Sequence, residues 1–179
     1  MRKALFFLGV LNDSDLDWLI AQGNKTDIAA DSVLIHQGKP IDSVFIILDG
    51  LFSVSTSSAP GKEVARLMSG EVLGEMSFLD SRPPSASVRA IEKSSVLAIP
   101  KSRLIAKLES DVAFAARFYR ALGVFLSDRL RSTIGLLGYG GNQPLSAREY
   151  ADEIDPETLD KVELAGARFD WLQRKLKSV

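Results

Sequence analysis

The stretch from Ser69 to Ala90 holds the residues whose types and spacing are best suited to binding chemistry. It reads SGEVLGEMSFLDSRPPSASVRA, and Gly74 allows a tight turn just before Glu75. Residues 75–79 can then form one helical turn whose free backbone N–H groups suit an anion. Glu75 at its start can accept hydrogen bonds from sugar hydroxyls. These groups suit a ligand with a sugar and a phosphate, although a glycine–acid pair between strands more often makes a plain turn.

Composition excludes several kinds of site. The 179 residues include no cysteine, which rules out disulfides, thiolate nucleophiles and iron–sulfur clusters. His36 is the single histidine, and we predict it on the outward face of a strand. With no nucleophile–base pair or metal cluster to assemble, we expect no enzyme activity, no metal and no cofactor. The net charge of −1 gives no basic field, so neither nucleic acid nor a membrane is an expected partner.

The elements that must position this stretch are mostly strands. From about residue 27 to residue 100, short apolar runs alternate with turn residues such as Asp49-Gly50 and Pro83-Pro84. Runs of this length, repeated every 8–12 residues or so, are typical of an antiparallel β-sandwich or β-roll. In one of them Phe52 and Val54 are predicted to share a face. The expected strand runs are residues 31–37, 43–50, 51–57, 62–68, 85–91 and 94–100.

Helices are expected on both sides of the strands. Residues 1–23 predict one or two short helices, with Asn12 or Ser14 as an N-cap. The basic and apolar start also has the outline of a signal peptide but lacks its usual cleavage signal, so we favour a cytoplasmic protein. Residues 101–110 predict an amphipathic helix, and residues 111–137 a longer one with a broad apolar stripe. The stripe comprises Ala115, Phe118, Leu122, Phe125, Leu126 and Leu130.

The tail has a different texture. Residues 138–147 are rich in breakers and predict a linker, and residues 148–179 predict an acidic segment followed by an amphipathic helix. That helix is expected to begin with Pro156 at its first position. Its apolar face must be buried either on its own domain or on a partner. The face comprises Val162, Ala165, Phe169, Leu172 and Leu176.

This order of elements resembles the cyclic-nucleotide-binding domain family, which includes the catabolite activator protein and the regulatory subunits of protein kinase A. The likeness covers roughly residues 5–135 by element order and motif spacing. A second motif, LIHQGKPIDSVFIILDG, resembles the family's strand–Gly–turn–strand–Gly signature and departs from it at Lys39 and Ile41. The resemblance implies an α+β fold for residues 1–137, with an eight-stranded antiparallel β-roll flanked by helices. It also implies that the long helix mediates a homodimer.

The resemblance assigns site residues one by one. Glu75 would bind the ribose 2′-hydroxyl, and the turn after it would face the cyclic phosphate. The family's phosphate-binding arginine falls on Pro84 here, so Arg82 or Arg89 would have to replace it. That contact is worth about 1.5–3 kcal/mol. The predicted ligand-binding residues are Gly74, Glu75, Met76, Ser77, Ser85, Ala86 and Arg82.

Two functions follow from this assignment. The first is a regulatory sensor of cyclic AMP, with cyclic GMP second, that signals through a protein partner or a homodimer by its long helix and its C-terminal helix. The second is a degenerate β-roll that binds no nucleotide and acts as a protein interaction module. An open pocket beside Glu75 would favour the sensor, whereas a pocket filled by Arg82 or by the long helix would favour the interaction module. The residues after 137 lack the two adjacent helices of a DNA-reading helix-turn-helix.

Overall fold

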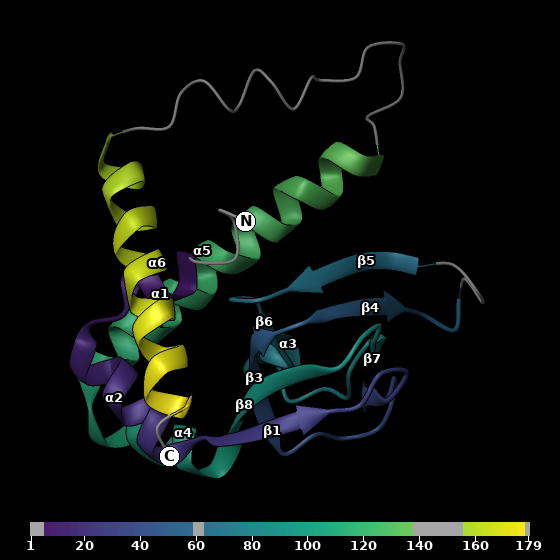
Figure 1. The fold of residues 1–179 in the computed structure, drawn as a ribbon, viewed down its shortest axis with the longest axis horizontal. Helices are drawn as coiled ribbons and strands as arrows, with labels where there is room; N and C mark the ends of the chain where they lie inside the picture. The colour runs from purple at the N-terminus through teal and green to yellow at the C-terminus, as the bar shows by residue number, and fades with distance from the viewer. Residues whose placement is uncertain (1–5, 59–62, 138–155, 178–179) are drawn as a thin grey trace.

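A computed structural model describes residues 6–58, 63–137 and 156–177, with α1, α2, α4 and α6 gathered at one end of two β-sheets (Figure 1). Both sheets are antiparallel and four-stranded, with strand orders β1-β8-β3-β6 and β2-β7-β4-β5. This arrangement confirms the predicted α+β β-roll. The strands are β1 (Asn24–Ile28), β2 (Val33–Ile35), β3 (Ser43–Asp49), β4 (Leu51–Ser55), β5 (Glu63–Met68), β6 (Val72–Leu73), β7 (Ser87–Ala90) and β8 (Ser94–Pro100).

The space between the sheets is filled by side chains from both of them. Phe52 of β4 is fully buried and Val54 packs against the same cluster, as the alternation in this strand predicts. The sequence did not indicate β1, a polar strand that pairs along β8, or β6, which has only two residues. The buried members of this cluster are Ile35, Ile47, Phe52, Leu67, Leu73, Val88, Ala90 and Val96.

Two short helices precede the roll, and capping fixes the start of the second. The Asn12 side chain accepts a hydrogen bond from the Asp15 amide at 2.9 Å, and the Asp15 carboxylate accepts one from the Asn12 amide at 3.0 Å. This reciprocal pair is a capping box, and it selects Asn12 rather than Ser14 as the N-cap. The helices of the structure are α1 (Phe6–Val10), α2 (Asp13–Gln22), α3 (Glu75–Leu79), α4 (Lys101–Ser110), α5 (Val112–Leu137) and α6 (Pro156–Lys177).

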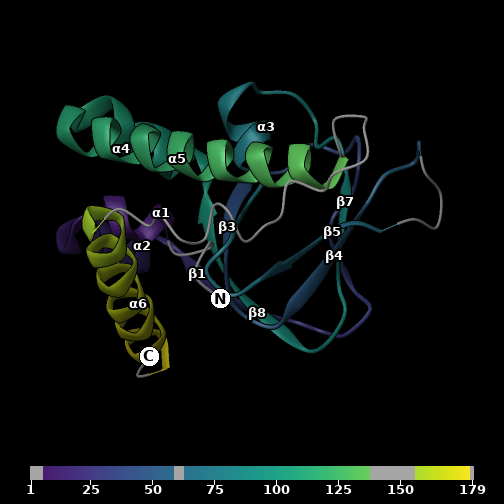
Figure 2. The same ribbon diagram turned by 90° about the horizontal axis from the view of Figure 1, so that it is seen from above.

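The long helix α5 runs along the roll and passes α3 (Figure 2). Its predicted apolar stripe packs within the chain, because Phe118, Leu122 and Phe125 are all buried. Phe118 stacks on Phe114 and meets Phe7 of α1 edge-on at 5.6 Å. By contrast, Leu130 at the far end of the stripe is 60% exposed.

The C-terminal helix α6 begins at Pro156, as predicted, and docks on its own domain. It contacts α1 and α2, and its residues Ala165, Phe169 and Leu172 are buried there. Phe169 and Leu172 belong to the same apolar cluster as the buried residues of α1, α2 and α5. The predicted linker 138–147 lies outside the described residues.

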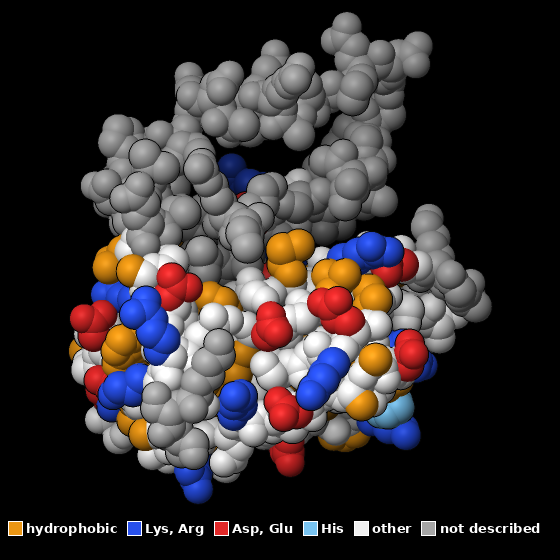
Figure 3. All heavy atoms as spheres, in the orientation of Figure 1, with side chains coloured by type: hydrophobic (Ala, Val, Ile, Leu, Met, Phe, Trp, Pro, Cys, Tyr) orange, Lys and Arg blue, Asp and Glu red, His pale blue; other side chains and the backbone are white. Residues whose placement is uncertain are grey.

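The surface is mixed in character. On the face shown in Figure 3, acidic, basic and apolar side chains alternate, and no continuous basic stripe is present among the described residues. His36 is exposed, as predicted, although it lies directly after β2 rather than within a strand. Within the described ranges, no helix is both long and apolar enough to cross a bilayer.

Candidate functional site

Gly74 makes the turn that aims α3. Its backbone is left-handed, with φ +77°, a conformation that glycine adopts without strain. A Cβ atom here would lie 2.7 Å from Cδ1 of Ile41 and 3.2 Å from the carbonyl oxygen of Ser43. The predicted helical turn over residues 75–79 is present as α3, directly after this glycine. Both the conformation and the close approach therefore require glycine at position 74.

Glu75 is a buried carboxylate with a cationic partner. Its residue is 3% exposed, and its Oε1 accepts a hydrogen bond from Nη1 of Arg129 at 2.7 Å. The Arg129 guanidinium also lies 5.4 Å from the ring centre of Phe125. Burial raises the pKa of Glu75 above its ordinary 4.5, and the positive charge of Arg129 acts in the opposite direction. This ion pair ties α3 to α5.

A second carboxylate, Glu71, belongs to the same electrostatic environment and was not predicted. Its Oε2 accepts a hydrogen bond from the Met68 amide at 3.0 Å. Burial raises its pKa, and the nearby charges of Glu75 and Asp128 add to that rise. Arg129 partly offsets it. One guanidinium thus faces several carboxylates, an arrangement that no sequence motif signals.

The loop at the predicted arginine position carries no cation toward Glu75. The Pro84 carbonyl accepts a hydrogen bond from the Gly38 amide at 2.9 Å, which fastens the loop to the β2–β3 turn. The Arg82 side chain is 84% exposed, and its Nε lies 4.0 Å from Oδ2 of Asp80. Arg89 donates to the Asp31 carbonyl. Of the two replacement arginines, neither pairs with Glu75.

The remaining predicted site residues differ in exposure. Met76 is 53% exposed, while Ser77 is buried and its carbonyl accepts a hydrogen bond from Nζ of Lys101 at 3.1 Å. This bond from Lys101 anchors α4 to α3. Burial lowers the pKa of the Lys101 amine. Ser85 is exposed and Ala86 is half-buried. The structure therefore groups Gly74, Glu75 and Ser77 around α3 and places Arg82 on the exposed loop that follows this helix.

Two hollows open near these elements, and Glu75 lines neither of them. A hollow of about 210 Å³ lies between α3, the loop after it and α4, with Ser77, Arg82 and Lys101 in its wall. A second, of about 480 Å³, lies where Gln37 faces the Ser55–Ser57 hydroxyls. We place the candidate site at Glu75 rather than in either hollow, because Glu75 is a buried charge at the start of α3. No group of side chains in the described part of the chain could hold a metal ion.

Known proteins share these features. The family model "Cyclic nucleotide-binding domain" matches residues 25–111. An uncharacterized NTE family protein of Mycobacterium tuberculosis is 28% identical over 120 residues, which are 66% of this chain and 20% of that protein. The cAMP-activated global transcriptional regulator Vfr of Pseudomonas aeruginosa is 28% identical over 131 residues, which are 69% of this chain and 58% of Vfr. The chain thus spans about a fifth of the first relative and less than two thirds of the second.

A solved structure supports the same fold. A cyclic nucleotide-binding domain from Methylobacillus flagellatus superposes with a TM-score of 0.68 at 21% identity, covering 77% of this chain and 84% of that one. The element order, the Gly74–Glu75 turn and the matched range agree with one another. Residues 25–111 of this chain match the cyclic nucleotide-binding domain family, and the β-roll agrees with that match.

Proposed function

We propose that this chain is a regulatory module that binds a cyclic nucleotide beside Glu75 and passes the signal on by protein contacts. The observation that carries the proposal is the buried Glu75 carboxylate at the start of α3, bonded to α5 through Arg129. A buried carboxylate is unfavourable unless it is paired, and it offers lone pairs to ribose hydroxyls. The preference for cyclic AMP over cyclic GMP rests on the likeness to a regulator named as cAMP-activated. The proposed contact residues are Gly74, Glu75, Met76, Ser77, Ser85, Ala86 and Arg82.

The Glu75–Arg129 pair suggests how a ligand at Glu75 would change the position of α5. A ribose that shares the Glu75 carboxylate would change the attraction between α3 and Arg129. Because Arg129 lies on α5, the preferred position of that helix would change with it. Tyr119 and Leu130 are exposed on α5, so its surface is available to a protein partner or a second copy. On this proposal α5 is the output element, and the activity is regulatory rather than enzymatic.

Proline at position 84 sets the expected affinity. The missing charge-assisted contact is worth about 1.5–3 kcal/mol. At 1.4 kcal/mol per decade, this loss is roughly ten- to a hundredfold in Kd. Micromolar binding is therefore expected rather than tighter binding.

The alternative is a β-roll that no longer binds nucleotide and acts as a protein interaction module. A specific observation favours it, because Arg129 from the long helix already occupies the Glu75 carboxylate. Arg82 is exposed beside Asp80 and Arg89 donates to the Asp31 carbonyl, which supports a loop without a phosphate-binding arginine. On this reading the Glu75–Arg129 pair is a structural cross-link between α3 and α5.

Isothermal titration of the full chain with cyclic AMP and cyclic GMP decides between the two. We expect micromolar binding of cyclic AMP that is lost in Glu75→Ala. Glu109→Ala, which removes an exposed carboxylate on α4, is the matched control and should bind as the wild type does. Circular dichroism confirms that each variant is folded.

The Pro84→Arg variant adds a gain-of-function arm. Restoring the arginine should tighten binding roughly ten- to a hundredfold if the loop has otherwise kept the family's geometry. No heat up to millimolar nucleotide from the folded wild type would refute the sensor and support the interaction module. Binding that survives Glu75→Ala would show that the ligand lies elsewhere.

A further inference from the structure

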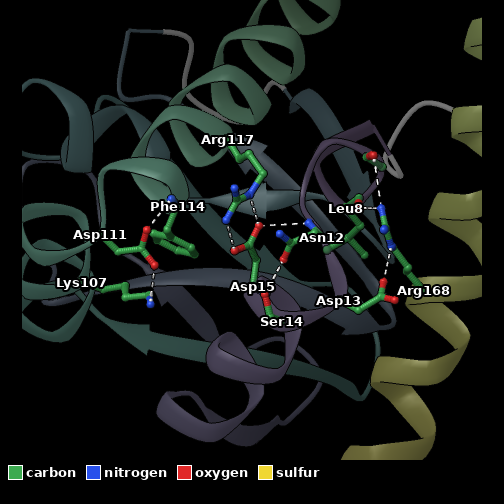
Figure 4. Close-up of polar contacts among 11 residues, drawn as sticks. Leu8, Asn12, Asp13, Ser14, Asp15, Lys107, Asp111, Phe114, Arg117 and Arg168 are labelled. Carbon is green, nitrogen blue, oxygen red and sulfur yellow. Dashed lines mark hydrogen bonds and ion pairs between the residues drawn. The ribbon is translucent and has the colours of Figure 1, made fainter.

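The turn between α1 and α2 is held by two arginines that come from different helices (Figure 4). Arg117 of α5 contacts Asp15 at two points, with Nε 2.6 Å from Oδ2 and Nη2 2.8 Å from Oδ1. Arg168 of α6 places its Nε 2.9 Å from Oδ1 of Asp13. Two neighbouring carboxylates of one helix start therefore bind cations from α5 and from α6.

The Asp15 carboxylate binds both Arg117 and the backbone at the start of α2. Its two oxygens each accept one hydrogen bond from Arg117, and Oδ2 also accepts one from the Asn12 backbone amide, which closes the capping box of α2. Asp15 is 3% exposed, so water cannot readily replace a lost partner. The conformation of the turn at Asn12 thus depends on the position of Arg117.

The α6 side of the turn depends on the same backbone. Nη1 of Arg168 lies 3.4 Å from the Leu8 carbonyl oxygen and 3.3 Å from that of Gly9. Both carbonyls are near the end of α1, where a helix leaves acceptors without internal partners. A shift of the turn would therefore change three contacts of Arg168 together: those to Leu8, Gly9 and Asp13.

Packing repeats this arrangement, because α1 and α2 lie between α5 and α6 (Figure 2). Phe7 of α1 meets Phe118 of α5 edge-on. The α6 residues Phe169 and Leu172 are buried in the cluster to which Phe7 belongs. In the described structure α6 pairs with no strand, and Gln173 Nε2 donates a hydrogen bond to the Leu48 carbonyl of β3 at 2.5 Å. Its release would break no strand pairing.

We propose that α6 docks reversibly on α1 and α2, and that this docking is coupled to the position of α5 through the Arg117–Asp15 and Arg168–Asp13 contacts. When Arg117 holds Asp15, the turn presents the carbonyls and carboxylate that Arg168 binds. When α5 shifts, the turn relaxes and α6 is released more often. Coupling of this kind is reciprocal and is commonly worth about five- to 150-fold in an equilibrium constant. The chain would thus convert a movement of α5 into exposure of the apolar face of α6.

Hydrogen exchange of the full chain, read by mass spectrometry over residues 164–176, tests the coupling without any ligand. Arg117→Met should raise the exchange of α6 amides by about five- to 150-fold, the range of such couplings. Amides of β3 and β8 report global unfolding, so their exchange should rise only by the factor that the measured loss of global stability gives. The matched control is Arg120→Met, which removes an exposed arginine one turn along the same helix and should leave α6 exchange unchanged.

Two further variants keep the test decisive. Arg168→Met breaks the α6 contact directly and must raise α6 exchange, which validates the readout. If it does so while α6 exchange in Arg117→Met equals the wild-type value, the coupling is refuted. If Arg117→Met unfolds the whole chain, Arg117→Lys decides, because it keeps the charge beside Asp15 but loses the two-point contact. Unchanged α6 exchange in that variant also refutes the proposal.

A ligand arm rests on the proposed function and can fail separately from the coupling. If cyclic AMP binds at Glu75, its addition should change α6 exchange in the wild type. Binding with no change in α6 would refute the link between the ligand and α6. If no nucleotide binds, the proposed function fails, and the comparison of Arg117→Met with Arg120→Met still judges the coupling.

Discussion

Replacing Arg117 by methionine leaves the Asp15 carboxylate buried with one backbone amide as its remaining partner. Removal of one partner from a buried ion pair typically costs about 3–5 kcal/mol. The Arg117 side chain is 31% exposed, so some water can reach the vacated position. We therefore expect Arg117→Met to lower the free energy of unfolding by about 2–3 kcal/mol, toward or below the low end of the typical cost because solvent screens the charge.

The matched comparison is a pair of equal length on the surface. The distance from Nε of Arg66 to Oε1 of Glu63 is 2.6 Å, the same as from Nε of Arg117 to Oδ2 of Asp15. Glu63 is 37% exposed, against 3% for Asp15. Because exposed pairs contribute little, Arg66→Met should leave the free energy of unfolding nearly unchanged. Because the two pairs have the same N–O distance, the difference between the two variants measures the effect of burial.

Urea unfolding followed by circular dichroism measures both variants at pH 7.5. The expected loss for Arg117→Met corresponds to a fall in Tm of about 4–12 °C for a chain of this size. A double-mutant cycle with Asp15→Asn should return a coupling energy of about 1–3 kcal/mol. If Arg117→Met lowered the free energy of unfolding no more than Arg66→Met does, burial would not be the cause of the Arg117–Asp15 pair's contribution to stability.

Three more outcomes follow from single features. Gly50→Ala should lower Tm more than Gly38→Ala, because both have positive φ but only a Cβ at Gly50 would lie 2.8 Å from a Cα atom of β8. Burial raises the pKa of Glu75 in the folded state, so ionisation of this carboxyl opposes folding. In urea unfolding experiments, the free energy of unfolding of the wild type should therefore rise relative to that of Glu75→Gln as the pH falls from 7.5 toward 4.5. The opposite slope would contradict this. Leu172→Ala should cost about 2–5 kcal/mol in urea unfolding if α6 is docked as described, whereas Leu164→Ala, at a position 46% exposed on the same helix, should cost little.

Local chemistry in the sequence was sufficient for many elements. Asn12 as an N-cap, Gly74 before a single helical turn and Pro156 at the start of α6 each depend on residues within a few positions. The six apolar runs all contain strands, because alternation and turn residues are local signals as well. The lack of a loop arginine at position 84 is also visible in the sequence alone.

Contacts between distant residues were decided by the tertiary structure. The polar strand β1 exists because β8 offers it an edge, and two-residue β6 exists because β3 does. The resemblance set Glu75 against a ligand and offered Arg82 or Arg89 as the phosphate-binding cation, but it indicated no cation paired with Glu75 itself. In the structure the cation is Arg129, which is 54 residues away.

The docking of α6 is another contact that the tertiary structure decided. Amphipathic periodicity predicts that one face of this helix is buried, but periodicity does not say against what. Arg168 reaches Asp13 across 155 residues, and Arg117 reaches Asp15 across 102. The fold brings each pair together, with Asp15 buried from competing water and Asp13 83% exposed, and spacing along the chain carries no signal of either contact.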